Sequence, residues 1–66
     1  MKPIIADKLK EWRQKNNITQ KELALRLGVT FQAISKWERE ECYPDILHLP
    51  VIAEVLECTI NDLFVM

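Results

Sequence analysis

Residues 20–39, QKELALRLGVTFQAISKWER, contain two runs of helical periodicity separated by a short break. The first run begins at a capping box, in which the Thr19 hydroxyl accepts from the Glu22 amide and the Glu22 side chain reaches back to the Thr19 amide. Gly28 then interrupts the apolar period, and Thr30 is an N-cap candidate for the second run. The segment therefore predicts two helices joined by a tight turn, over about 20–27 and about 31–39.

Upstream of this segment, the same 3.6-residue period predicts another helix. It enters at Pro3, a residue that is tolerated in a first helical turn. It ends at Asn17, because Asn adopts the left-handed conformation of a helix terminator at modest cost.

Downstream, two more helices are expected, which gives an all-α domain of five short helices. The fourth helix starts near His48 or Leu49, because Pro50 then falls in its first turn. A second capping box, Thr59 to Asp62, opens a short fifth helix that ends at about Phe64.

The composition indicates one globular domain spanning residues 1–66, with 48 % apolar and 29 % charged residues. Cys42 and Cys58 are too few for a disulfide scaffold, and with His48 they match no zinc-site spacing. We interpret them as small apolar fillers, and a redox switch or an intermolecular disulfide is the alternative. No apolar run approaches the ~18 residues of a membrane span. We therefore expect a cytoplasmic protein with no metal and no cofactor.

Charge is distributed unevenly along the chain, although the formal net charge is only −1. Residues 1–39 hold all nine Lys and Arg against four acids, whereas residues 40–66 hold six acids and no base. A basic half can meet a polyanion while the acidic half faces solvent or a partner.

The predicted helix over 31–39 has two different faces at about 100° per residue. Such a helix can lie in the DNA major groove, where Gln pairs with adenine, Lys donates to guanine, and an apolar ring contacts the thymine methyl group. A solvated face, or a face that binds another protein, is the alternative. The inner face holds Ala33, Ile34, Trp37 and Glu38, and the outer face holds Phe31, Gln32, Ser35, Lys36 and Arg39.

Over nearly its whole length, the chain resembles the phage repressor and Cro type of helix-turn-helix, also called the XRE family of bacterial regulators. The stretches LKEWRQKNNITQKELALRLGV, TFQAISKWE, YPDILHLPVIAEVL and TINDLF follow the family pattern in order. The resemblance implies a compact, lambda repressor-like domain of bacterial or phage origin. It also implies a transcriptional regulator that binds double-stranded DNA sequence-specifically through its third helix.

The resemblance places particular residues at the interface with DNA. Phe31, Gln32 and Lys36 fall at base-contacting positions, and Ser35 shares their face, so we predict base contacts for all four. Phosphate contacts are expected at Gln20, Thr30, Lys21 and Arg39, because a helix N-terminus and basic side chains attract phosphate.

Other positions are structural in the family. The resemblance implies that Arg13 and Glu38 form a buried ion pair that ties the first helix to the third. Loss of one partner costs about 3 to 5 kcal/mol, so Arg13→Ala should lower stability. Most relatives carry Gly where this chain has Glu40 and Glu57, so either these residues accept left-handed strain or the helices continue by a residue.

Catalysis is not expected, because the chain has one His, no phosphate loop and no nucleophile and base at recognisable spacing. We predict a repressor that binds a pseudo-palindromic operator as a homodimer, because one module reads few bases. A protein-interaction module, such as an antitoxin or accessory subunit with weak DNA binding, is the alternative. The predicted dimer contact is the apolar end, unless it seals the core instead: Leu63, Phe64, Val65 and Met66.

Overall fold

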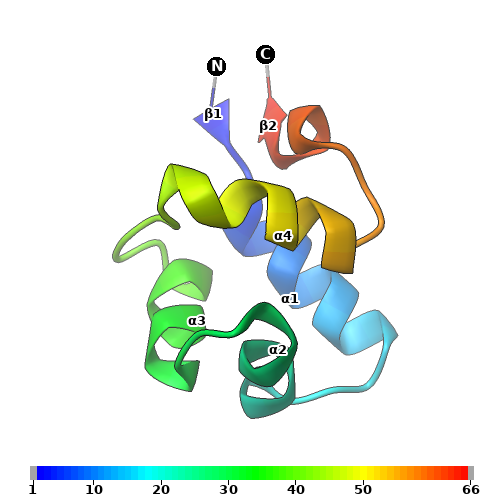
Figure 1. Ribbon diagram of the computed structural model, residues 1–66, viewed down its shortest axis with the longest axis vertical. Coiled ribbons are helices and arrows are strands. Elements are labelled where there is room, and N and C mark those ends of the chain that lie inside the picture. Colours follow the sequence, from blue (N-terminus) through cyan, green and yellow to red (C-terminus); the bar gives the residue numbers. More distant parts are fainter. Residues whose placement is uncertain (1, 66) are drawn as a thin grey trace.

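The computed structural model describes residues 2–65, which form a bundle of short helices (Figure 1). The beginning and the end of this part of the chain lie side by side at one edge of the bundle. Two 3-10 turns and two very short strands complete the described part. In chain order the elements are β1 (Lys2–Pro3), α1 (Ile5–Lys15), α2 (Gln20–Leu27), α3 (Phe31–Glu38), η1 (Ile46–His48), α4 (Leu49–Val55), η2 (Ile60–Leu63) and β2 (Phe64–Val65).

The core takes one central side chain from each of α1, α2, α3, α4 and η2. These five side chains have no exposed surface, and each contributes roughly 1.5–3 kcal/mol through burial. Because every helical segment except η1 supplies one, the orientation of α3 relative to the rest of the domain is fixed by packing. The five are Leu9, Leu23, Ile34, Ile52 and Leu63.

Threonine caps start α2, α3 and η2, as the sequence predicts. The hydroxyls of Thr19, Thr30 and Thr59 each accept from the backbone N–H three residues later. At Thr59 the capping box is complete. At Thr19 the predicted return bond is wrong, because the Glu22 carboxylate instead lies 3.6 Å from Arg26 one turn ahead.

Each of the four α-helices ends in the same backbone turn. After α3, the Glu40 N–H donates to the Trp37 carbonyl (3.2 Å) and the Glu41 N–H to the Lys36 carbonyl (2.9 Å), the pair of bonds that defines a Schellman motif. The motif requires a left-handed residue, and all four have φ between 58° and 71°: Asn17, Gly28, Glu40 and Glu57.

The two glutamates therefore accept left-handed strain rather than extend their helices. This conformation costs about 1–2 kcal/mol for a residue with a Cβ. In three of the four turns an apolar residue follows the left-handed position and packs against the core: Ile18, Val29 and Cys58. This contact offsets the strain at Asn17 and Glu57, whereas Gly28 has none to offset. After α3 the corresponding residue is Glu41, which is exposed.

The two ends of the domain differ from the prediction. Pro3 lies in β1 rather than in a first helical turn, because Lys2 and Pro3 pair antiparallel with Val65 and Phe64. The Ile4 N–H also donates to the Leu63 carbonyl (2.8 Å), so α1 begins only at Ile5. The predicted fifth helix is a four-residue 3-10 turn, since Phe64 must become extended to reach β1.

The predicted dimer contact at the apolar end is wrong for Leu63, which is completely buried in the core. Phe64 is half-buried and packs against the same cluster. The side chain of Val65 and the whole of Met66 lie outside the described residues. Core sealing, the alternative reading of this segment, therefore accounts for Leu63 and Phe64.

Candidate nucleic-acid interface

The outer face of α3 is built as the helical period predicts. Ile34, Trp37 and Glu38 are buried against the rest of the domain, and Ala33 is half-buried. The opposite side presents four exposed side chains and one half-buried one. The exposed ones are Phe31, Gln32, Lys36 and Arg39, and Ser35 is half-buried.

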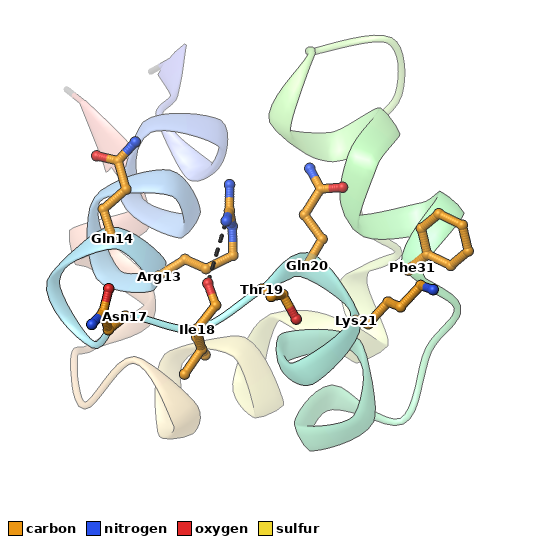
Figure 2. A pocket seen from close by; sticks show the side chains of 8 residues that line it. All are labelled: Arg13, Gln14, Asn17, Ile18, Thr19, Gln20, Lys21 and Phe31. Atoms are coloured by element: carbon orange, nitrogen blue, oxygen red, sulfur yellow. Dashed lines mark hydrogen bonds between the residues drawn. The ribbon is translucent and has the colours of Figure 1, made fainter.

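At the start of α3, a predicted base contact lies beside a predicted phosphate contact. The Lys21 ammonium is 5.4 Å from the centroid of the Phe31 ring. Figure 2 shows both side chains at one end of an open groove that also runs past Gln20 and Arg13. A cation over an aromatic face contributes about 0.5–1 kcal/mol at exposed sites, so this contact helps hold the Phe31 ring in position.

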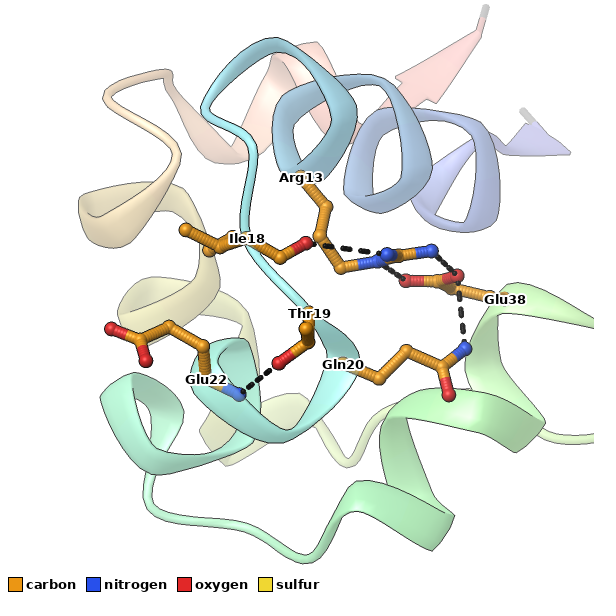
Figure 3. A network of polar contacts seen from close by, with 6 residues as sticks. All are labelled: Arg13, Ile18, Thr19, Gln20, Glu22 and Glu38. Atoms are coloured by element: carbon orange, nitrogen blue, oxygen red, sulfur yellow. Dashed lines mark hydrogen bonds and ion pairs between the residues drawn. The ribbon is translucent and has the colours of Figure 1, made fainter.

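Glu38 forms the expected ion pair with Arg13 (Figure 3). Arg13 Nε donates to Oε2 and Nη2 to Oε1, both at 2.9 Å, and Nη1 donates to the Ile18 carbonyl at 3.3 Å. The hydrogen bond to Glu38 raises the pKa of Arg13 despite partial desolvation. The pair therefore joins the end of α1 and the turn before α2 to the buried side of α3.

Gln20 has a partner that the sequence does not predict. Its Nε2 donates to Glu38 Oε1 at 3.2 Å, so the amide closes the ion-pair network rather than pointing freely outward. Thr19 takes the N–H groups of Glu22 and Leu23, which leaves those of Gln20 and Lys21 as the open donors of the α2 start. The family resemblance pairs Glu38 with Arg13 only, and nothing in the sequence spacing identifies Gln20 as a further partner of the Glu38 carboxylate.

Thr30 lies exposed at the start of α3, where its hydroxyl oxygen accepts from the Ala33 N–H at 3.2 Å. Its hydroxyl proton is not used by the cap. Thr30 therefore combines the structural role and the outward position that the resemblance implies.

At the other end of α3, Arg39 is bound to two groups of its own chain. Arg39 Nε donates to Glu41 Oε2, and Nη1 donates to Ser35 Oγ. The hydrogen bond from Arg39, together with the charges of Arg39 and Lys36, lowers the pKa of the Glu41 carboxyl. The sequence places Ser35 and Arg39 on one face, but it does not identify Glu41 as their partner.

Among residues 2–65, no group of three or more His, Cys, Asp or Glu side chains is arranged to hold a metal ion. Cys58 is half-buried, and desolvation raises the pKa of its thiol. Cys42 is exposed, so the interpretation as an apolar filler is wrong for Cys42. His48 lies at the start of α4 as expected, with its ring centroid 5.7 Å from that of Trp37. None of the helices in this part of the chain has the length and apolarity needed to cross a bilayer.

The fold and this face define a small helical domain organised around a helix-turn-helix. Residues 9–63 match the family described as helix-turn-helix. The protein therefore belongs to the helix-turn-helix family, as its sequence pattern predicts.

Individual relatives share most of the chain. Over 57 residues it is 40 % identical to the HTH-type transcriptional activator BcrR of Enterococcus faecalis. This match covers 86 % of this chain and 28 % of BcrR. It is 38 % identical over 58 residues to an uncharacterized HTH-type transcriptional regulator of Archaeoglobus fulgidus, covering 88 % of this chain and 82 % of that protein. The P22 c2 repressor, solved in complex with synthetic operator 9T, superposes with a TM-score of 0.84 and 31 % identity over 92 % of each chain.

The chain thus spans just over a quarter of BcrR but most of the archaeal regulator.

Proposed function

We propose that this protein is a sequence-specific, double-stranded DNA-binding transcriptional regulator that places α3 in the major groove. The observation that carries the proposal is the division of α3 into two faces. Three of its residues are buried against the domain, while Phe31, Gln32 and Lys36 project from the opposite side. A helix held rigidly at its back can present side chains to base edges with little loss of conformational entropy.

The proposed base contacts follow from chemistry. Gln32 pairs with adenine N6 and N7, Lys36 donates to guanine O6 and N7, and the Phe31 ring contacts a thymine methyl group. Ser35 either donates or accepts, depending on its neighbours. The Lys21–Phe31 contact supports this arrangement, because it holds the ring at the rim of the face that would meet DNA.

Phosphate contacts surround these four side chains in the proposal. Lys21 lies at the start of α2, and Thr30 caps α3. The side-chain amide of Gln20 is bound to Glu38, so we propose that Gln20 contacts phosphate through its backbone N–H. This N–H lies at the N-terminus of α2, where the helix dipole attracts an anion. Arg39 lies at the far end of α3, where its bonds to Glu41 and Ser35 compete with the predicted phosphate contact.

We propose a repressor that occludes a promoter in a bacterium or phage-infected cell. The name of the P22 c2 repressor supports this, whereas BcrR is named as an activator. The archaeal relative shows that the family is not confined to bacteria. We give the P22 c2 repressor more weight, because this chain covers 92 % of its solved chain but only 28 % of BcrR.

We also propose a homodimer, because one such module buries only about 600–1,000 Å² on DNA and reads few bases. Four exposed apolar side chains lie between the end of α3 and the middle of α4: Tyr43, Ile46, Leu47 and Val51. Between Tyr43 and Val51 the sequence carries one carboxylate, Asp45, and one imidazole, His48, but no Lys, Arg or Glu, so two copies can meet there across a two-fold axis. This surface replaces the apolar C-terminal end as the proposed dimer contact.

Sedimentation equilibrium tests the dimer contact, using Leu47→Ser against Leu25→Ser. Leu47 and Leu25 are 80 % and 81 % exposed, and Leu25 lies on α2, so the two variants lose the same side chain at different places. We expect Leu47→Ser alone to weaken the dimer. Equal dimer constants for the two variants would exclude this surface.

A binding selection tests the DNA-reading function. Wild-type protein and Gln32→Ala are each titrated with randomised duplex DNA at two salt concentrations, and the retained fraction is sequenced. Asn61→Ala is the control, because Asn61 is an exposed amide side chain on η2 and does not line the groove beside Phe31. We expect a motif with two symmetric halves that Asn61→Ala retains and Gln32→Ala loses or relaxes. Weak, unselective retention that disappears at higher salt would instead favour a protein-interaction module.

A further inference from the structure

The end of α3 differs from the ends of the other three α-helices in one residue. After α1, α2 and α4, the residue that follows the left-handed position is apolar and packs on the core. After α3 this residue is Glu41, whose side chain is exposed. The backbone bonds from Glu40 to Trp37 and from Glu41 to Lys36 hold Glu41 against the last turn of α3. Its carboxylate is therefore positioned by a defined turn rather than by a free loop.

Glu41, Arg39 and Ser35 form a chain of side-chain contacts along the outer side of α3. The guanidinium donates through Nε to the Glu41 carboxylate and through Nη1 to the Ser35 hydroxyl. Glu41 is also in the field of Lys36. Arg39 is thus engaged at both edges by groups of its own chain before any partner arrives.

This arrangement bears on how the domain would discriminate between sequences, and the inference rests on the proposed DNA-binding function. A free arginine at this position attracts any phosphate, whatever the neighbouring bases are. A carboxylate bound to the same guanidinium competes with the phosphate and repels it.

We propose that Glu41 is a positioning residue that lowers sequence-independent binding by holding Arg39 away from phosphate and against Ser35. The second half of this role concerns the Ser35 hydroxyl. Because Ser35 Oγ accepts from Arg39, the hydroxyl proton is directed to another acceptor. On a base edge, such acceptors are purine N7, guanine O6 and thymine O4. Glu41 therefore favours a hydrogen bond from Ser35 to a base and disfavours a contact between Arg39 and phosphate.

The size of the effect follows from the salt dependence of phosphate contacts. One added contact makes the slope of log K against log salt steeper by about 0.9 on duplex DNA. Between 50 and 200 mM salt, this corresponds to about a 3.5-fold larger loss of affinity. Releasing Arg39 from Glu41 should add about one such contact.

The test measures binding of a random-sequence duplex by wild type, Glu41→Gln and Glu40→Gln over this range of salt. Glu40 is the matched control, because it is adjacent and exposed, its replacement changes the net charge equally, and it has no ion pair within residues 2–65. Thermal unfolding of each variant establishes that it is folded. We expect tighter binding and the steeper slope for Glu41→Gln only. Adding Arg39→Gln should remove both effects, since Arg39 transmits them.

The outcomes distinguish a failure of the Glu41 role from a failure of the proposed DNA binding. If wild type binds and both Gln variants gain equally, net charge alone acts and the role of Glu41 is overturned. It is also overturned if Glu41→Gln keeps the wild-type slope, or keeps its gain in the absence of Arg39. If none of the proteins binds duplex DNA at 50 mM salt, the proposed function fails together with this inference.

Discussion

Replacing Arg13 by Met tests the ion pair that holds α3 in place, because Met keeps the apolar stem and removes the charge. In the wild type, the Glu38 side chain is only 4 % exposed, and Arg13 meets both of its oxygens at 2.9 Å. Without Arg13, the carboxylate keeps only the Gln20 amide at 3.2 Å. The variant therefore leaves a nearly buried charge without its counter-charge.

The expected loss is about 3 kcal/mol, the lower end of the range for breaking a buried pair. It lies at the lower end because the Arg13 side chain is 21 % exposed and Gln20 still donates to Glu38. A domain of this length has a total stability of roughly 3–10 kcal/mol. The melting temperature should therefore fall by about 12–24 °C, or the domain should be largely unfolded at ambient temperature.

Urea unfolding followed by circular dichroism measures this loss, with Glu22→Gln as the control. Glu22 lies in the first turn of α2 and forms an ion pair with Arg26 in which both side chains are about half exposed, so its loss should cost no more than about 1 kcal/mol. Adding Glu38→Met to Arg13→Met should recover part of the loss, because no unpaired carboxylate remains. A cost below about 1 kcal/mol for Arg13→Met, or a double variant as unstable as the sum of its parts, would show that the Glu38 carboxylate does not depend on Arg13.

Three further perturbations follow from the fold. Glu40→Gly and Glu57→Gly should each raise the urea midpoint by an amount equivalent to about 1 kcal/mol, since Gly relieves the left-handed strain; unchanged midpoints would mean that the turns are not strained. Leu63→Ala should lower the free energy of unfolding by about 2–5 kcal/mol, and a loss under 1 kcal/mol would contradict its place in the core. The Thr59 N–H donates to the Asp62 carboxylate and lowers its pKa, so Asp62 stabilises the fold at neutral pH and loses this effect as the pH falls through the folded-state pKa. Thermal unfolding of Asp62→Asn should therefore differ from wild type more at pH 7 than at pH 2, and an equal difference at both pH values would exclude the linkage.

Much of the fold could be predicted because local signals and burial agree. Thr30, Gly28 and Pro50 each fix a helix boundary through backbone chemistry that needs no tertiary partner. The pairing of Pro3 with Phe64 could not be predicted in this way. It joins the two ends of the chain through strands of two residues, which are too short for any periodicity to appear.

The candidate interface, like the fold, could be predicted only where local periodicity determines it. The outer face of α3 follows from its period, since Gln32 and Lys36 lie opposite Ile34. The partners of individual side chains do not follow, because they depend on how the turns fold back. Gln20 reaches Glu38, and Glu41 reaches Arg39, only after the turns around α2 and α3 have formed.

Gln32 on α3 should read bases in the major groove, and a single-atom change in the DNA tests this contact. Once a binding site has been selected, adenines in each half-site are replaced by 7-deazaadenine, which removes the N7 acceptor in the major groove. Our account predicts that one such replacement weakens wild-type binding by about 1 kcal/mol or more and leaves the Gln32→Ala variant unaffected. Equal losses for both proteins, or no loss at any adenine, would contradict it.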